Sequence, residues 1–329
     1  MKVKDLSYAS PEHPFAKRLL IQAIEEISGR RRFLPLYRHW QTHVAPSSSR
    51  MMGDMLDLID VRVDITGVWP PQVRPDDKLV MIANHPFGIG DGIALLSLAE
   101  QLERPYKVLI NAELLKINEI RPFSLPVDFS ETREALKNNI ATRKAALDAL
   151  RDGTTIVVFP GGGVATTAHP FRGRALELPW QPFIARLIQS AQASVLPVFI
   201  EGQNSKLFHM ASHVSDTLRT SLLVSEFRRF AGSNLPVRVG EMMPFDALEN
   251  PTDRPALMNE LFERVMSLGL ADEATLGEGP EFFQWDRRFA ETVKGRLRRV
   301  RDRGRRAARR DRSPDAVDAH RKPPVAADS

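Results

Sequence analysis

Residues 79–92 read LVMIANHPFGIGDG, an uninterrupted apolar run that passes through a polar turn into a glycine-containing segment. A short apolar run closed by turn residues is typical of a strand buried on both faces of a sheet. The apolar periodicity that follows predicts a helix from Asp91 to Leu102. A buried strand that leads directly into a helix is the repeating unit of a parallel α/β sheet.

The same alternation continues on both sides of this stretch. Apolar or β-branched runs predict strands at 61–65, 79–83, 108–110, 125–127, 154–159, 195–200 and 237–239. Helical spacing of apolar residues predicts helices at 14–29, 51–58, 91–102, 131–151, 183–191, 253–268 and 281–310. In the helix at 131–151 we expect Ala135, Ile140 and Leu147 on the buried side. The pattern predicts an α/β fold with a mixed, largely parallel sheet flanked by helices, a leading helical pair and a basic C-terminal helix.

Charge is distributed unevenly along the 329 residues, which carry 46 Lys+Arg against 41 Asp+Glu. Eleven basic and two acidic residues lie between Lys294 and Arg312, which leaves residues 1–293 slightly acidic. The chain has no cysteine, and this excludes disulfides, thiolate-ligated metal sites and a thiol nucleophile. We expect no transmembrane helix and no signal peptide, because no sufficiently long apolar run is present.

Composition and patterning predict four segments. We expect an N-terminal helical segment at 1–59 and an α/β domain at 60–270, whose motif core is 78–205. An amphipathic basic helix is expected at 271–312 and a disordered tail at 313–329.

The basic helix has an apolar stripe formed by Phe282, Trp285, Phe289 and Val293. A helix of this type suits an anionic membrane surface, although the stripe is equally compatible with packing on the body of the protein. Nucleic acid is not an expected partner, because the body is acidic and no nucleic-acid motif is present.

The polar turn after the first buried strand contains Asn84 and His85, and Asp91 follows at the expected start of a helix. A carboxylate that reaches an imidazole fixes its tautomer and makes the ring a general base. Because no Ser, Thr or Cys lies between His85 and Asp91, such a base would activate a substrate hydroxyl. In the alternative, Asp91 is only the N-cap of the helix and His85 is a turn histidine. Spacing alone leaves both interpretations open.

A second turn, Gly161-Gly162-Gly163, follows the strand at 154–159. Three glycines allow close backbone approach, so their N–H groups are suited to a phosphate or an oxyanion. A simple tight turn is an equally good explanation of the three successive glycines. The Lys-Ser/Thr of a nucleotide-binding P-loop is missing.

Four segments in this order resemble the glycerolipid acyltransferase superfamily, whose members esterify lysophosphatidic acid and related lysolipids. They are Asn84-His85-Pro86 with Asp91-Gly92, the stretch 114–128, Val158-Phe159-Pro160-Gly161-Gly162, and the stretch 195–205. These motifs are most similar to those of the bacterial hemolysin-like branch. That branch includes the acyltransferase that completes ornithine lipid from its lyso form.

The resemblance implies an O-acyltransferase of membrane lipid biosynthesis that acts as a peripheral protein on the cytoplasmic face of the membrane. An acyl thioester of coenzyme A or acyl carrier protein would be the donor, a lysolipid the acceptor, and no separate cofactor or metal is implied. His85 would be the general base and Asp91 its partner. Asn84 and the backbone of Gly161, Gly162 and Gly163 would lie at the substrate.

Two departures from the superfamily pattern concern the catalytic blocks. Five residues separate His85 from Asp91, one more than usual, and Gly88 and Gly90 are suited to absorb the extra residue. The Glu and Arg of the third block are also missing, since glycine and alanine occupy that region.

The phosphate-binding Arg of the second block has no counterpart either, and Arg121 and Arg133 are the nearest substitutes. This loss predicts an acceptor other than ordinary lysophosphatidic acid, either a lyso-aminolipid or a neutral-headed lysolipid. The alternative function is a catalytically weak or silent lipid-binding relative at the membrane surface.

Overall fold

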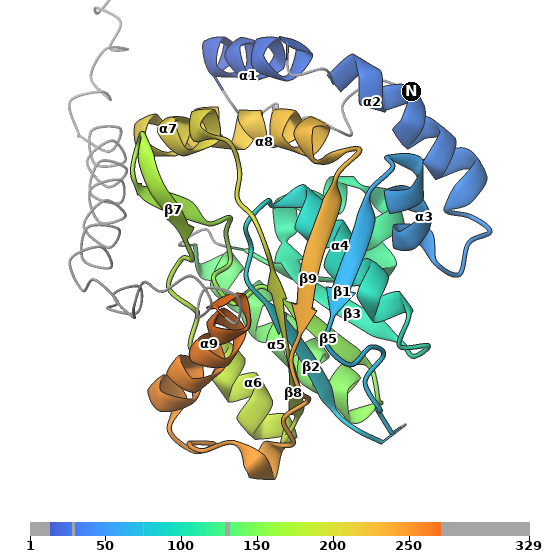
Figure 1. Ribbon diagram of the computed structural model, residues 1–329, viewed down its shortest axis with the longest axis vertical. Coiled ribbons are helices and arrows are strands. Elements are labelled where there is room, and N and C mark those ends of the chain that lie inside the picture. Colours follow the sequence, from blue (N-terminus) through green and yellow to red (C-terminus); the bar gives the residue numbers. More distant parts are fainter. Residues whose placement is uncertain (1–13, 28–29, 75, 129–131, 271–329) are drawn as a thin grey trace, which may run out of the picture. The chain divides into compact units, whose positions relative to one another are not determined.

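The computed structural model describes residues 14–27, 30–74, 76–128 and 132–270 (Figure 1). Its main feature is a seven-stranded sheet in the order β1-β9-β8-β2-β5-β3-β4. Strands β8 and β9 are antiparallel, and all other neighbours in this sheet are parallel. The predicted α/β class with a mixed, largely parallel sheet is confirmed.

The strands of the main sheet are β1 (Arg62–Thr66), β2 (Leu79–Ala83), β3 (Tyr106–Asn111), β4 (Ser124–Val127), β5 (Thr155–Val158), β8 (Ser194–Ile200) and β9 (Asn234–Val239). A separate antiparallel hairpin consists of β6 (Thr166–His169) and β7 (Arg172–Leu176). The helices are α1 (Phe15–Ile27), α2 (Arg30–His39), α3 (Met51–Leu58), α4 (Ile89–Glu100), α5 (Arg133–Arg151), α6 (Phe183–Ala191), α7 (Lys206–Val214), α8 (Asp216–Phe230) and α9 (Arg254–Leu270). Shorter helical turns are Trp40–Val44, Ala112–Lys116, Asn118–Phe123 and Phe245–Ala247.

Strand β2 lies at the centre of the hydrophobic core, and all five of its side chains are fully buried. Leu79 and Met81 pack into a cluster with α3, α4 and the end of α8, whereas Val80 and Ile82 pack into a second cluster with α5, α6 and α9. The apolar run at 79–83 is therefore uninterrupted because the strand has helices on both faces.

Several features of the secondary structure differ from the predictions. The predicted leading helical pair is wrong, because a third helix, α2, lies between α1 and α3. In α5, Ala135 is buried but Ile140 is 52% exposed. Ile140 is two residues before the buried Thr142, about 200° round the helix, so it falls on the opposite face. The hairpin β6–β7, whose residues are mostly exposed, and helices α7 and α8 were not predicted.

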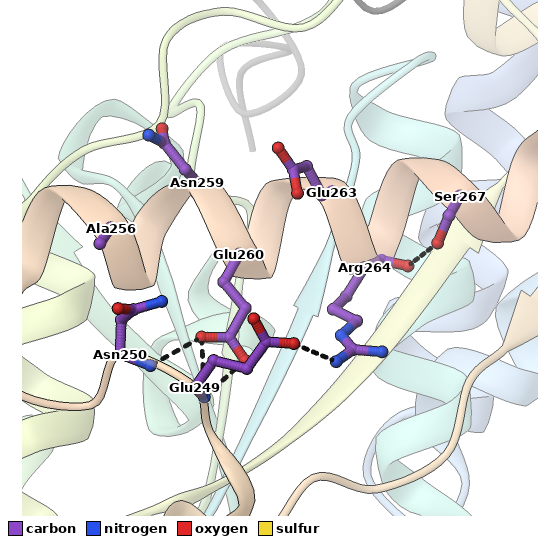
Figure 2. A pocket seen from close by; sticks show the side chains of 8 residues that line it. All are labelled: Glu249, Asn250, Ala256, Asn259, Glu260, Glu263, Arg264 and Ser267. Carbon is purple, nitrogen blue, oxygen red and sulfur yellow. Dashed lines mark hydrogen bonds and ion pairs between the residues drawn. The ribbon is translucent and has the colours of Figure 1, made fainter. Parts of the chain in front are cut away.

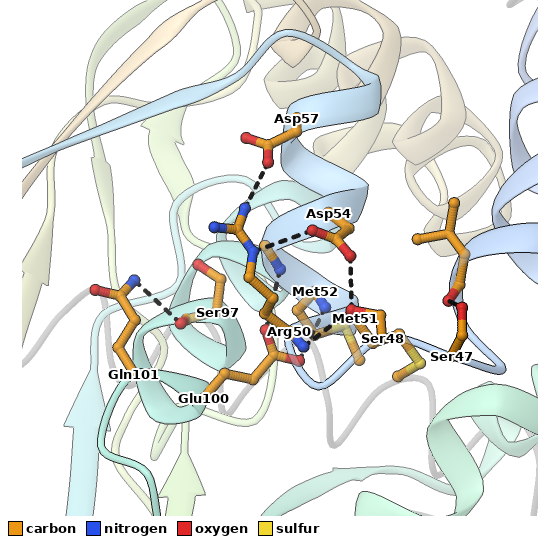
Figure 3. Close-up of polar contacts among 12 residues, drawn as sticks. Ser47, Ser48, Arg50, Met51, Met52, Asp54, Asp57, Ser97, Glu100 and Gln101 are labelled. Atoms are coloured by element: carbon orange, nitrogen blue, oxygen red, sulfur yellow. Dashed lines mark hydrogen bonds and ion pairs between the residues drawn. The ribbon is translucent and has the colours of Figure 1, made fainter.

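Helix α3 is fixed to α4 through a carboxylate. The backbone N–H groups of Met52 and Gly53, in the first turn of α3, donate to Glu100 at 2.9 and 3.0 Å (Figure 3). These N–H groups have no partner within their own helix, so Glu100 satisfies them from outside. Burial raises the pKa of Glu100, and the two backbone hydrogen bonds act in the opposite direction.

Helix α9 is likewise held by a carboxylate, which binds the loop that precedes the helix. The carboxylate of Glu260 accepts the backbone N–H groups of Glu249 and Asn250 (Figure 2). These residues line a surface pocket of about 500 Å³, and none of the predicted site residues lies in it.

Within the described ranges, no helix has the length and apolar character needed to cross a bilayer. The predicted basic helix at 271–312 and the tail at 313–329 lie outside the described residues. The predicted segment boundaries therefore stay predictions.

Candidate active site

The site begins where β2 ends. Asn84, the next residue, is buried and holds β2 against its parallel neighbour β8. Its side-chain Nδ2 donates to the carbonyl of Ile200 at 2.8 Å, and its Oδ1 accepts the Ile200 N–H at 2.7 Å. Both polar atoms of the Asn84 amide are thus used within the protein, which gives this predicted substrate-binding residue a structural role.

His85 and Asp91 lie together. The His85 Nδ1 and the Asp91 Oδ1 are 3.2 Å apart, within ion-pair distance, and neither atom has a hydrogen-bond partner elsewhere in the described chain. Asp91 is completely buried, and 16% of the His85 side chain is exposed. The extra residue in the spacing does not keep the two side chains apart.

The alternative interpretation, in which Asp91 is only the N-cap of the helix, is wrong. The N-cap is Gly88, with a φ of +93°, and Asp91 lies in the first turn of α4. The Asp91 Oδ2 accepts the N–H of Phe87 at 2.7 Å, so one carboxylate oxygen fixes the turn while the other faces His85. Asp91 therefore holds the turn and faces His85 at the same time.

The pKa of His85 is raised above its ordinary value by its surroundings. Burial alone lowers this pKa, but the charge and contact of Asp91 outweigh burial, and Glu177 acts in the same direction as Asp91. The positive charge of Arg219 opposes them. The imidazole also stacks on Phe159, with ring centroids 4.1 Å apart. The ring is thus held in place, and the two carboxylates stabilise the imidazolium relative to its ordinary equilibrium with the neutral ring.

The glycine loop, residues 159–165, lies against the turn that contains His85. The N–H of Gly162, whose φ is +65°, donates to the carbonyl of Phe159 at 3.0 Å and closes a tight turn. Ala165, just beyond the glycines, donates its N–H to the carbonyl of His85 at 2.8 Å. A Cβ on Gly161 would lie 3.2 Å from the carboxylate of Glu177, so a larger residue there would crowd this carboxylate. The predicted loop and the predicted base are brought together.

Glu177 is the main residue that the sequence did not reveal. It follows β7, is buried, and accepts the backbone N–H of His85 on Oε1 at 2.7 Å. Its Oε2 is buried without a hydrogen-bond partner in the described chain. Burial raises the pKa of Glu177 to about 7, and the negative charge of Asp91 adds to this effect. No motif surrounds Glu177, so only the folded chain places it at the site.

Arg219, on α8, is the second residue that the sequence did not indicate. Its Nη2 donates to the carbonyl of Val164 in the glycine loop, and its guanidinium lies over the ring of Phe208, 5.7 Å from the centroid. The sequence predicted no element at 216–230, so no signal pointed to this arginine.

The two arginines that were expected to replace the lost phosphate ligand are placed differently. Arg121 is exposed and its Nε donates to the carbonyl of Leu115 at 2.6 Å. Arg133 is exposed at the start of α5. Over the described ranges, no hydrogen bond or ion pair joins either arginine to His85, Asp91 or Glu177.

Comparison with known proteins gives one family. A family model described as an acyltransferase matches residues 67–243. A lyso-glycine lipid O-acyltransferase from Phocaeicola vulgatus is 22% identical over 219 residues, which cover 64% of this chain and 74% of the relative. The crystal structure of a 1-acyl-sn-glycerophosphate (LPA) acyltransferase from Thermotoga maritima aligns with a TM-score of 0.46 and 14% identity, over 80% of this chain and 98% of that one.

Proposed function

Because this chain belongs to the acyltransferase family, whose model covers more than half of it, we propose that it transfers a fatty acyl group to the hydroxyl of a lysolipid. The observation that carries the proposal is the pair formed by His85 and Asp91, 3.2 Å apart at the end of the central strand. The relative from Phocaeicola vulgatus, named for a lyso-glycine lipid, supports a lysolipid as the acceptor.

In the proposed reaction His85 is the general base. Its Nδ1 faces the carboxylate of Asp91, which favours the tautomer with the proton on Nδ1 and leaves the Nε2 lone pair available. Nε2 takes the proton of the acceptor hydroxyl while the hydroxyl oxygen bonds to the carbonyl carbon of the acyl thioester. When the tetrahedral intermediate collapses, the C–S bond breaks and the leaving thiolate takes the proton from His85.

Backbone donors around the turn would stabilise the negative charge on the thioester oxygen. The N–H of Gly162 is already bonded to Phe159, so we assign this role to Gly161, Gly163 and the first turn of α4. Asp91 stabilises the imidazolium that forms when His85 takes the proton.

We also propose the acyl donor and the place of action. Coenzyme A or acyl carrier protein would carry the thioester, and the product would enter membrane lipid biosynthesis. The enzyme would act as a peripheral protein on the cytoplasmic face, bound to anionic lipid through residues 271–312.

The test is acyl transfer by the purified full chain from acyl-coenzyme A or acyl carrier protein to a panel of lysolipids. General-base catalysis contributes about 10²- to 10⁴-fold, so His85→Ala should lower the rate by that factor. His169→Ala, on an exposed histidine of β6, is the matched control and should retain the wild-type rate. If the wild type binds lysolipids but transfers no acyl group to any of them, the protein is a silent lipid-binding relative and the proposal is wrong.

A further inference from the structure

The hairpin β6–β7 is bonded at both ends to the turn that contains His85. Just before β6, Ala165 donates its backbone N–H to the carbonyl of His85 at 2.8 Å. Just after β7, Glu177 accepts the backbone N–H of His85 at 2.7 Å. The chain from Ala165 to Phe171, at the tip of the hairpin, spans at most about 20 Å, which is about the thickness of one leaflet of a bilayer. The tip is therefore tied to the proposed base within that distance.

The turn at the tip contains an aromatic residue that the fold does not require. His169 pairs with Arg172, so Pro170 and Phe171 form a two-residue turn. Two-residue hairpin turns favour Gly, Asn and Asp, which adopt the turn conformation most easily. Phe171 is instead 70% exposed, and its ring would gain free energy if an apolar phase covered it.

Helix α7 extends the apolar surface beside the hairpin (Figure 1). Near the end of α7, the Nε2 of His213 lies 2.9 Å from the carbonyl oxygen of Thr167 on β6. Leu207 and Val214 are exposed and lie about two helical turns apart, on one face of α7. We define the hairpin–α7 surface as the exposed apolar residues of these two elements, which are Phe171, Leu176, Leu207 and Val214.

The charge carried by the hairpin and by α7 has one sign. Residues 166–176 and 203–215 contain no Asp or Glu, although residues 1–293 as a whole are slightly acidic. Arg172 is exposed at the start of β7, and Lys206 is exposed at the start of α7. A surface that combines exposed apolar and cationic side chains is suited to a membrane that contains anionic lipid.

Charge also selects among the occupants of this surface. A second copy of the hairpin and α7 would bring like charges together, and so would the basic segment 294–312 of the same chain. An anionic bilayer instead offers an apolar phase to the exposed side chains and negative head groups to Arg172 and Lys206.

We propose that the hairpin–α7 surface docks on an anionic bilayer, with Phe171 inserted among the lipid head groups and Arg172 bound to lipid phosphates. The inference rests on the proposed function, because the same bilayer would supply the lysolipid acceptor. It adds a membrane contact in the α/β domain to the one proposed for residues 271–312. Docking would bring the acceptor hydroxyl to His85 while the lipid stays at the membrane surface.

A probe attached at the tip tests the contact directly. The chain has no cysteine, so Phe171→Cys in the full chain can be labelled with an environment-sensitive fluorophore at one position only. Vesicles of phosphatidylglycerol and phosphatidylcholine should shift the emission of the label to shorter wavelength and protect it from quenching by acrylamide. The control is Val68→Cys, on a side chain that is 77% exposed in the loop after β1, and its label should show neither change. Because β1 runs antiparallel to β2, this loop leaves the sheet at the edge opposite to the site.

Three outcomes of this experiment would overturn the proposal. The first is a protein that does not bind the vesicles. The second is a label at position 171 that stays accessible on vesicle-bound protein, because another part of the chain would then carry the binding. The third is a label that is protected without vesicles. Protection that depends on protein concentration would identify a second copy on this surface, and protection that does not would identify another segment of the same chain.

Cosedimentation of the full chain with the same vesicles measures the strength of the contact. Phe171→Ser should weaken binding about 10-fold, because the ring no longer leaves water. Arg172→Gln should weaken it about fivefold, the usual effect of one cation near an anionic membrane. Val68→Ser and Arg151→Gln, on exposed side chains away from the hairpin, should bind as the wild type does. All these proteins share residues 271–312, so an unchanged affinity of Phe171→Ser would refute the docking.

Vesicle contact and acyl transfer separate this inference from the proposed function. A label at position 171 that is protected by vesicles, in a protein that transfers no acyl group, would support the docking and refute the proposed function. Acyl transfer by a protein whose label stays accessible would refute the docking and support the proposed function. If both hold, Phe171→Ser should slow transfer to a lysolipid in vesicles about 10-fold and leave transfer to a monomeric short-chain lysolipid unchanged.

Discussion

Replacing Asp91 with Asn tests the active-site geometry most directly. Asp91 accepts the N–H of Phe87 on one oxygen and faces His85 with the other. Asn retains one oxygen for the Phe87 bond, so the turn should persist. The amide NH₂ would then face His85 Nδ1, which must become an acceptor. The ring proton therefore moves to Nε2, the atom that has to take the substrate proton.

The size of the effect follows from the 3.2 Å contact. Coulomb's law with an effective dielectric constant of about 20 gives about 5 kcal/mol for full charges at this distance, several times the ~1.4 kcal/mol of a tenfold change. Loss of this interaction leaves burial as the largest influence on the pKa of His85, which should fall. Because the wrong tautomer cannot act as a base, kcat/KM should fall by about 10²- to 10⁴-fold.

The assay is the pH profile of kcat/KM for the wild type and the Asp91→Asn variant. In the wild type, activity should rise with pH through a His85 pKa that lies above the ordinary value of 6.5, since the base must be neutral. In the variant, the remaining activity should show its acidic limb at lower pH. Asp54→Asn, on the partly exposed first turn of α3, is the control and should change neither rate nor profile. A variant with wild-type kcat/KM, or with an unmoved limb, would refute the pairing of His85 and Asp91.

The remaining predictions concern other contacts of the site and its scaffold. Glu177→Gln keeps an acceptor for the His85 N–H but removes a negative charge, so the pKa of His85 and the acidic limb of kcat/KM should move to lower pH; an unmoved limb would contradict this. Gly161→Ala should lower the free energy of unfolding by about 1–3 kcal/mol in denaturant titrations, because its Cβ approaches two oxygens at 3.2 Å, whereas Gly92→Ala, with open space, should cost nothing. Glu100→Ala should cost about 1–3 kcal/mol by the same measurement, because two N–H groups of α3 lose their acceptor; no change would show that water replaces it.

Secondary structure in the core could be predicted because buried faces carry apolar residues at regular intervals in the sequence. Strand β2 is buried on both faces, and its apolar letters match the predicted range 79–83 without a shift. The hairpin β6–β7 is mostly exposed, so its sequence has no such apolar pattern. The expectation for Ile140 was wrong because residue type alone does not distinguish an exposed isoleucine from a buried one.

The site divides in the same way. His85, Asp91 and the three glycines are each within eight residues of a strand end, so local sequence sufficed to name them as candidates. Glu177 is 92 residues from His85 in the chain and lies beside it only because the segment after β7 returns to the glycine loop. Arg219 reaches the same loop from α8, 55 residues beyond Val164.

The sequence by itself determined the α/β sheet, the acyltransferase resemblance and the candidate base, since these depend on local periodicity and on short motifs. Only the tertiary structure decided that Asp91 faces His85 from the first turn of α4 rather than from its N-cap. It also decided which charges surround the base, because the electrostatic energy of a site depends on distances in space between groups that the chain keeps far apart.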